Sequence, residues 1–116
     1  MSGLMIGDIA VQRIIEEEVP FFIPHETFVE ATPEALAPHR HWLEPNAMDP
    51  ETGMLILPFQ SYLVRTKHHT ILIDTCIGCG KSITHRPQWF QRTDQTWLNN
   101  LRAAGLQPEA IDYVFC

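Results

Sequence analysis

Alternation of apolar and polar residues predicts a first strand over residues 6–16, a stretch rich in β-branched side chains. Arg13 interrupts the apolar face of this strand. The acidic run Glu16-Glu17-Glu18 is interpreted as the solvated end of the strand, because acidic runs mostly lie in water. The apolar positions that share one face are Ile9, Val11 and Ile15.

A second alternation predicts a β-hairpin over residues 59–74. Odd positions 59–65 alternate with even positions 60–66, and a three- or four-residue polar loop around Lys67-His68-His69 then turns the chain. The returning strand contains the branched run Ile71-Leu72-Ile73 and leads directly into Asp74. A strand that ends in an acid and a glycine-containing loop is typical of the places where α/β proteins carry chemistry.

The spacing of apolar residues changes after an irregular loop over residues 75–92 and predicts a helix over residues 94–104. Thr93 or Asp94 is the expected N-cap, and Gly105 stands where a helix end favours a left-handed residue. Pro108 begins a tight turn into a last strand over residues 111–116. Strand, crossover helix and strand form a βαβ unit with parallel strands and a right-handed connection, so the fold class is α/β.

The segment 19–58 differs from the rest because it holds seven of the nine prolines. Prolines at this density exclude a long helix, although Thr32 could cap a short one that begins at Pro33. Its aromatic residues argue against a disordered linker and favour either a substrate lid or an arm that covers the sheet. The candidate lid residues are Phe21, Phe22, Phe28 and Trp42.

Composition narrows the classes of partner and compartment. The 116 residues are 45% apolar and 19% charged, and the net charge of −6 disfavours nucleic acid and anionic membranes as partners. The longest apolar run, residues 54–57, is too short to span a bilayer, and residues 1–11 lack an export signal. Three cysteines, an odd number, fit a reducing compartment, so we expect a soluble cytoplasmic protein.

Two loop motifs have competing interpretations. Residues 78–82 (GCGKS) resemble the end of a phosphate-binding P-loop, but Thr75 replaces the required glycine and Pro87 follows where a helix should run. Cys76-x-x-Cys79 is consistent with plain loop thiols, a redox pair or half a structural zinc site. A redox pair normally begins a helix, and a zinc site needs two further ligands, so plain thiols are favoured.

The histidines give no metal or catalytic site from spacing. His39-x-His41 lies among prolines with no carboxylate nearby in sequence, and His68-His69 occupies the predicted hairpin turn. His25 and His85 are isolated and are interpreted as packing or hydrogen-bonding residues. No Ser, His and Asp set is identifiable, so the sequence assigns neither a catalytic residue nor a metal ligand.

Asp74 has two interpretations. Its carboxylate could cap its own loop through the backbone amides of Thr75, Ile77 or Gly78. Alternatively, it could lie beneath a metal centre and orient the residues that bind the metal. A carboxylate after three branched apolar residues needs donors or a cation in either case.

Three segments carry a resemblance to a known family: residues 58–66 (PFQSYLVRT), 70–78 (TILIDTCIG) and 97–115 (WLNNLRAAGLQPEAIDYVF). Together they resemble the N-terminal half of metallo-β-lactamase-fold hydrolases, and most closely the branch of methyl parathion hydrolase and the acyl-homoserine lactonases. In that family a strand ending in L-I-D-T-G precedes a helix x-L-x-x-L-x-x-x-G. A strand I-D-x-V then leads into T-H-x-H-x-D-H, which supplies zinc ligands. Cys76 stands where the family has glycine, and the histidine motif would begin after Cys116.

The resemblance, which spans roughly Ile6 to Cys116, implies the N-terminal half of a four-layer αβ/βα sandwich with a mixed sheet. It implies one or two zinc ions in the parent protein, which lower the pKa of bound water to about 7. Only Asp74 carries over, as an acid that supports the metal site without binding the metal. Every residue that binds the metal would lie beyond Cys116.

We therefore expect an N-terminal fragment of a zinc-dependent hydrolase that acts on a small ester, lactone or phosphotriester-like substrate. The chain itself is expected to bind no catalytic metal, to be inactive and poorly stable alone, and to pair with the missing C-terminal half or a second copy. One alternative is a small α/β binding module that uses the aromatic loop of residues 21–42. A less favoured one is a thiol-redox protein.

Overall fold

The structure of the protein is a computed structural model that describes residues 3–116. The chain divides into two units, which are described separately. Unit 1 comprises the N-terminal segment up to Glu17 together with Phe59–Cys116, and unit 2 comprises Glu18–Pro58. No helix within residues 3–116 is long and apolar enough to cross a membrane.

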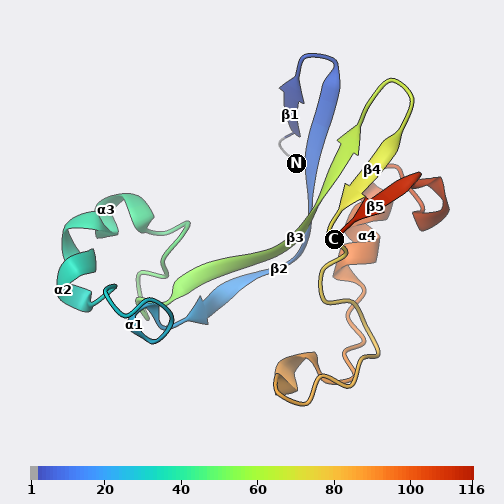
Figure 1. The fold of residues 1–116 in the computed structure, drawn as a ribbon. Coiled ribbons are helices and arrows are strands. Elements are labelled where there is room, and N and C mark those ends of the chain that lie inside the picture. Colours follow the sequence, from blue (N-terminus) through green and yellow to red (C-terminus); the bar gives the residue numbers. More distant parts are fainter. Residues whose placement is uncertain (1–2) are drawn as a thin grey trace. The chain divides into compact units, whose positions relative to one another are not determined.

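Within residues 3–116, five strands form one sheet in the order β1-β2-β3-β4-β5 (Figure 1). Strand β1 pairs antiparallel with β2, and β3 pairs antiparallel with β4. Strands β4 and β5 are parallel, so the sheet is mixed and the predicted α/β class with parallel strands around a crossover helix is confirmed. The strands are β1 (Gly3–Ile6), β2 (Ile9–Phe22), β3 (Leu55–Arg65), β4 (Thr70–Ile73) and β5 (Tyr113–Phe115).

Helix α4 (Thr96–Ala103) provides the cover for one face of the sheet in unit 1. Its Leu101 packs against Ile14 of β2 and Leu63 of β3, and all three side chains are fully buried. Asn100 donates to the backbone carbonyl of Ile15 at 2.8 Å and ties the helix to β2. The helix-period residues predicted from sequence therefore face the core, among them Trp97, Leu98 and Ala104.

The first predicted strand was wrong in extent and in its buried face. Gly7 and Asp8 form a turn, with Gly7 at φ +60°, so the segment is a hairpin. Strand β2 then continues through the acidic run to Phe22. The fully buried side chain is Ile14, on the face opposite the predicted set of Ile9, Val11 and Ile15.

The turn of the second hairpin and the end of the helix agree with the sequence, although β3 begins at Leu55, before the predicted residue 59, and β5 is shorter than the predicted 111–116. Arg65 pairs with Thr70, which leaves a four-residue loop over residues 66–69. Gly105 adopts φ +82° directly after the C-cap of α4. Helix α4 is shorter than the predicted 94–104, because Asp94 precedes it and accepts a hydrogen bond from the Thr96 amide at 2.7 Å. Two short 3₁₀ helices, η2 (Pro87–Trp89) and η3 (Pro108–Ala110), interrupt the connections.

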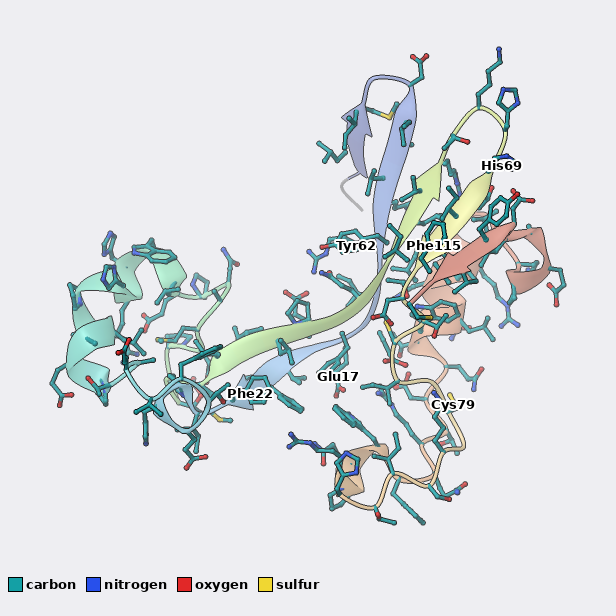
Figure 2. The ribbon with its side chains drawn as sticks, viewed as in Figure 1. Glu17, Phe22, Tyr62, His69, Cys79 and Phe115 are labelled. Carbon is teal, nitrogen blue, oxygen red and sulfur yellow. The ribbon has the colours of Figure 1, made fainter. Side chains whose placement is uncertain are left out.

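The other face of the sheet in unit 1 exposes large apolar side chains. Tyr62 pairs with Ile73, and Ile73 pairs with Phe115, so the three side chains lie on one face. Their exposed fractions are 39%, 42% and 57% (Tyr62 and Phe115 are labelled in Figure 2). On the same face of the β1–β2 hairpin, Leu4 is 60% exposed. We name this set of four residues the open sheet face; contiguous apolar surface of this kind is typical of an interface.

Unit 2 contains four short helices, more than the single short helix that the sequence predicts after Thr32, together with the end of β2 and the start of β3. The helices are α1 (Pro24–Thr27), α2 (Pro33–Leu36), the 3₁₀ helix η1 (Ala37–His39) and α3 (Arg40–Leu43). The Thr32 hydroxyl accepts a hydrogen bond from the Ala35 amide at 3.2 Å, which confirms the predicted cap and a helix beginning at Pro33. Met48 is 2% exposed and bridges to Leu55, which fixes the return of the chain into β3.

Candidate functional site

The loop after β4 has an unusual backbone. Asp74 has φ +66° and Cys76 has φ +59°, left-handed values that side chains other than glycine rarely adopt. Asp74 offsets part of this strain because its Oδ1 atom accepts a hydrogen bond from the Cys76 amide at 2.7 Å. The Asp74 amide donates to the Phe115 carbonyl of β5 at 2.7 Å. Strained backbone at the carboxyl end of a strand marks this loop as a candidate site.

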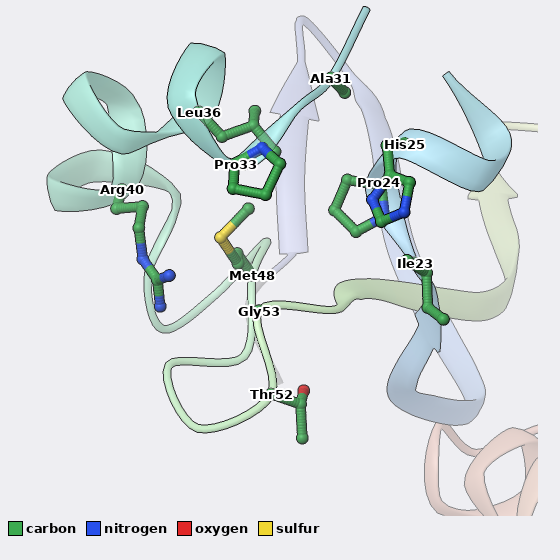
Figure 3. A pocket seen from close by; sticks show the side chains of 10 residues that line it. All are labelled: Ile23, Pro24, His25, Ala31, Pro33, Leu36, Arg40, Met48, Thr52 and Gly53. Carbon is green, nitrogen blue, oxygen red and sulfur yellow. The ribbon is translucent and has the colours of Figure 1, made fainter. Parts of the chain in front are cut away.

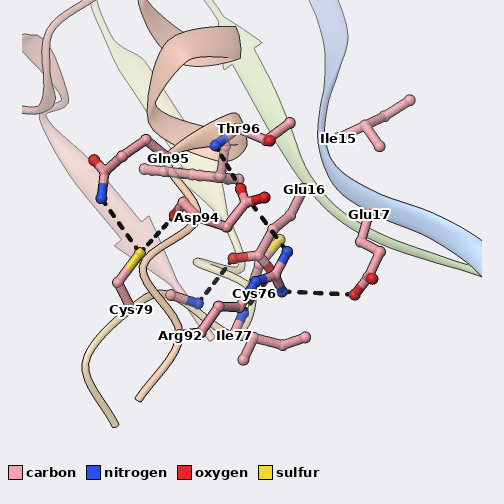
Figure 4. Close-up of polar contacts among 12 residues, drawn as sticks. Ile15, Glu16, Glu17, Cys76, Ile77, Cys79, Arg92, Asp94, Gln95 and Thr96 are labelled. Atoms are coloured by element: carbon pink, nitrogen blue, oxygen red, sulfur yellow. Dashed lines mark hydrogen bonds and ion pairs between the residues drawn. The ribbon is translucent and has the colours of Figure 1, made fainter. Parts of the chain in front are cut away.

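Glu16 of β2 holds the same loop from the other side (Figure 4). The Ile77 amide donates to one carboxylate oxygen and the Gly78 amide donates to the other, both at 2.9 Å. The Glu16 side chain is buried. The prediction of a solvated acidic run is therefore wrong for Glu16, whose buried carboxylate is stabilised by two backbone donors, whereas Glu18 is exposed.

Arg92 places a positive charge among the carboxylates of Glu16, Glu17 and Asp94, and its side chain is largely buried. We call these four residues the Arg92 cluster. Its Nη1 atom lies 4.0 Å from a Glu16 oxygen and 3.5 Å from a Glu17 oxygen (Figure 4). Its Nη2 atom lies 3.9 Å from Asp94. Within residues 3–116, Nη1 has no hydrogen-bond partner, so its attraction to the carboxylates is one of charge. Arg92 thus joins β2, the loop and the approach to α4.

Cys76 contacts the buried core through Ser61. Its Sγ atom lies 3.4 Å from the Ser61 hydroxyl, which also accepts a hydrogen bond from the Trp97 indole at 2.8 Å. Burial raises the pKa of the Cys76 thiol above its ordinary value of 9.0; the hydrogen bond with Ser61 opposes this, and the charges of Glu16 and Asp74 add to it. A reactive redox thiol needs a lowered pKa, so the partly buried position of Cys76, which raises its pKa, disfavours redox chemistry there.

Cys79 is exposed and lies at the start of the connection to α4. Its thiol donates to the Asp94 carbonyl at 2.7 Å and accepts a weak contact from the Gln95 amide at 3.6 Å. Both cysteines of the motif are free. Hydrogen bonds from the Thr96 backbone and side chain hold the pKa of the Asp94 carboxyl below its ordinary value of 3.8.

Asp74 and Glu16 bind different amides of the loop after β4. Asp74 caps its own loop as one interpretation held, but it does so through the Cys76 amide, not through Thr75, Ile77 or Gly78. Glu16 occupies the last two amides. Because those amides are already bound to a carboxylate, they offer no cradle to a phosphate group, which agrees with the absence of a P-loop motif.

The candidate lid residues all lie in unit 2 but do not share one contact. Phe21 and Phe22 meet edge to face at 4.7 Å between ring centroids. Trp42 instead contacts His39, with its indole nitrogen 3.3 Å from the His39 ring nitrogen. Phe28 and Trp42 are exposed. Exposed aromatic side chains are compatible with either a lid or a covering arm.

Sequence reasoning missed Glu16 and Arg92 as site residues. The signal for Glu16 was its spacing of two from Ile14, which places both on one face of a strand. The apolar set chosen from the sequence had the opposite parity, so Glu16 was assigned to water. Arg92 gave no usable signal, because it lies in an irregular loop far in sequence from its partner Glu16.

The described residues do not fit a metal ion. Within residues 3–116, no group of three or more His, Cys, Asp or Glu side chains is placed to hold a metal. Both oxygens of Glu16 are bound to backbone amides, and Asp74 uses one oxygen for the Cys76 amide. A zinc centre of the kind that the resemblance implies therefore cannot be built from these residues alone.

Comparison with known proteins shows the fold. A probable metal-dependent hydrolase from Staphylococcus aureus superimposes with a TM-score of 0.67 at 23% identity, over 96% of this chain and 38% of that one. The hydrolase AbOPH of the beta lactamase superfamily superimposes with a TM-score of 0.56 at 22% identity, over 97% of this chain and 33% of that one. No protein-family model and no curated protein matches the sequence.

One neighbour is a probable metal-dependent hydrolase and the other is a hydrolase of the beta lactamase superfamily, and the chain shares their mixed α/β fold. It spans between a third and two fifths of their length. At identities of 22% and 23% the likeness is one of fold. What the chain does must therefore be argued from its own residues.

Proposed function

We propose that the chain is the N-terminal part of a zinc-dependent metallo-β-lactamase-fold hydrolase, in the methyl parathion hydrolase and acyl-homoserine lactonase branch. The observation that carries the proposal is the superposition of 96% of the chain on 38% of a probable metal-dependent hydrolase. The strand-loop sequence around Asp74 and the strained backbone at this position support it.

The open sheet face supports the same proposal from packing. One face of the sheet is covered by α4, whereas Tyr62, Ile73 and Phe115 on the other face remain exposed. A four-layer sandwich needs a second sheet against that face. In this proposal the further half of the domain, or a second copy of the chain, covers it and supplies the residues that bind one or two zinc ions.

Asp74 is proposed to support the metal site without touching the metal. Its Oδ1 atom is engaged by the Cys76 amide, and its exposed carboxylate makes no other hydrogen bond within residues 3–116. The second oxygen is therefore able to accept a hydrogen bond from a residue that binds the metal. Phe21, Phe22, Phe28 and Trp42 are proposed to form a lid over a small ester, lactone or phosphotriester-like substrate in the cytoplasm.

The first test is to determine the coding sequence downstream of Cys116 in all three frames. Thr-His-x-His-x-Asp-His in any frame would support the proposal, and its absence from all three would contradict it. The extended chain should then bind zinc and hydrolyse a lactone or ester. Zinc-dependent turnover by the purified chain of 116 residues would overturn the proposal that this part is inactive.

A second candidate function, a small α/β binding module, has one observation in its favour. Phe28, Val29 and Trp42 of unit 2 are all exposed, and large exposed apolar side chains are typical of a binding surface. High stability of the isolated monomer, with a cooperative unfolding transition, would favour this candidate, since half of a sandwich should be only poorly stable alone.

A further inference from the structure

Unit 2 contains a pocket that neither the proposed hydrolysis nor the candidate lid residues account for (Figure 3). It has a volume of about 190 Å³. Its lining residues are Ile23, Pro24, His25, Ala31, Pro33, Leu36, Arg40, Met48, Thr52 and Gly53. All of them belong to unit 2, so the shape of the pocket depends on that unit alone.

The pocket is open because the local sequence cannot fill it. Pro24 and Pro33 each begin a helix of only four residues, α1 and α2, and these short helices leave a gap over the buried side chain of Met48. Gly53 adopts φ +69° and has no side chain; a Cβ atom there would lie 3.9 Å from Nη1 of Arg40. That distance is an ordinary van der Waals contact, so glycine is favoured at this turn by its left-handed backbone.

Arg40 is held in place by two of its three nitrogens. Its Nε atom donates to Glu44, and its Nη2 atom donates to the Pro50 carbonyl at 3.3 Å. Its Nη1 atom makes no hydrogen bond to any of residues 3–116. A donor fixed at the wall of a largely apolar pocket provides one oriented hydrogen bond for a ligand.

The charge around the pocket favours a neutral ligand. Glu44 neutralises Arg40, and the chain carries a net charge of −6, so a free anion gains little from entering. The size limits the ligand as well, because a dry cavity of roughly 150 Å³ holds benzene. We propose that this pocket binds a compact neutral carbonyl compound of about six to nine heavy atoms, with its oxygen on Nη1 of Arg40.

The proposal is tested with cyclohexanone, which has a carbonyl oxygen, an apolar ring and no hydrolysable bond. In a ¹H–¹⁵N NMR titration of the full chain, we expect shifts at the amides of Ala31, Leu36 and Gly53, with Kd on the order of 1 mM for so small a ligand. Cyclohexanecarboxylate should bind about fivefold more weakly, because its charge is unmatched. No shift at tens of millimolar, or tighter binding of the carboxylate, would overturn the proposal.

Two matched pairs of variants separate this site from nonspecific binding. Ala31→Leu fills the pocket and should weaken cyclohexanone binding by about tenfold, whereas Ala35→Leu changes an exposed position of α2 outside the pocket and should not. Glu44→Gln retains an acceptor for Arg40 but removes the neutralising charge, so it should favour the carboxylate over the ketone. Equal binding by both alanine variants, or an unchanged preference in Glu44→Gln, would contradict the proposal.

The outcome is independent of the hydrolase proposal. Cyclohexanone binding needs neither a metal ion nor a second half of a domain, so a missing zinc motif downstream would leave this result unaffected. Conversely, failure of the ketone to bind would remove the pocket from consideration while the hydrolase proposal stood on its own sequence test.

Discussion

The two units of the chain are stabilised in different ways. Unit 1 depends on contacts between residues far apart in sequence: Ile14, Leu63 and Leu101 come from two strands and a helix and are each 0% exposed. Unit 2 has only Pro24 and Met48 buried among residues 18–58. It is held instead by local hydrogen bonds and by prolines that restrict the unfolded chain.

This difference teaches where the candidate chemistry can be precise. The strained loop at Asp74 lies in unit 1, where Glu16 and Arg92 fix its position through contacts of more than 60 residues separation. The pocket lies in unit 2, where short helices leave space unfilled. Rigid support suits a site that orients other residues, and unfilled space suits the binding of a small ligand.

The largest effect should come from Leu101→Ala. This side chain lies at the centre of the unit 1 core, and its removal leaves a cavity between α4 and the sheet. We expect a loss of about 3 kcal/mol in the free energy of unfolding, measured by urea denaturation. NMR signals of unit 2, such as those of Ala31 and Gly53, should keep their positions at denaturant concentrations that abolish those of unit 1.

Simultaneous loss of signals from both units would contradict this distinction. Strands β2 and β3 continue from one unit into the other, so such a result would show that the sheet transmits unfolding along its length. Met48→Ala is the matched test in unit 2. It should cost less than Leu101→Ala, because Met48 already lines an open pocket.

Glu16→Gln should have the next largest effect. The amide can accept only one of the two hydrogen bonds from Ile77 and Gly78, and Arg92 loses its most buried countercharge. We expect a loss of about 2 kcal/mol in urea denaturation. Hydrogen exchange at the Ile77 and Gly78 amides should accelerate by a larger factor than elsewhere in unit 1.

Glu17→Gln provides the matched control on the same strand. Glu17 lies on the face of β2 opposite Glu16 and is partly exposed. Within the Arg92 cluster it contacts only Arg92, at 3.5 Å. Its replacement should cost about 0.5 kcal/mol. Equal costs for the two variants would show that the Glu16 carboxylate does not hold the loop.

Glu16 also shows why part of the site could not be predicted. A hairpin with its turn at residues 66–69, a helix before Gly105 and the cap at Thr32 follow from local patterns, and the structure confirms these three features but not the predicted bounds of the strands and the helix. The burial of Glu16 depends on amides 61 and 62 residues away, which no local pattern reveals. Odd- and even-numbered residues of β2 lie on opposite faces of the sheet. The apolar odd-numbered residues suggested that their face is buried, but the buried face is the even-numbered one, which carries Glu16.

Asp74 illustrates the opposite case. Its position at the end of a buried strand was visible in the sequence, and its capping of the loop follows from ordinary aspartate chemistry. Which amide it caps could not be predicted, because that depends on the left-handed backbone at Asp74 and Cys76. The resemblance to the hydrolase family implied an α/β fold with a mixed sheet, and the structure and the superpositions confirm that part of the prediction.

Alkylation of the three cysteines should sharpen the contrast between buried and exposed positions. Because its pKa is raised, Cys76 should remain a neutral thiol at pH 8 and react with iodoacetamide about tenfold more slowly than Cys79 or Cys116. Mass spectrometry of peptides after timed quenching measures the rates. Fast reaction of Cys76 at pH 6 would show an acidic thiol and revive the redox interpretation.

The smallest effect concerns an aspartate that is hydrogen-bonded by a nearby threonine, an arrangement found in both units. In unit 2 the Thr52 hydroxyl holds the pKa of the Asp49 carboxyl below 3.8, and in unit 1 backbone and side-chain hydrogen bonds from Thr96 do the same for Asp94. A lowered pKa stabilises the folded state above pH 3.8, and this contribution is lost as pH falls through the folded pKa. Thr52→Val should therefore raise the pKa of Asp49 toward 3.8 and leave that of Asp94 unchanged. Thr52→Ser should restore it, and carboxyl ¹³C titration from about pH 2 to pH 6 measures both groups across the ordinary aspartate range; a parallel shift of Asp94 would show that the two units are electrostatically coupled.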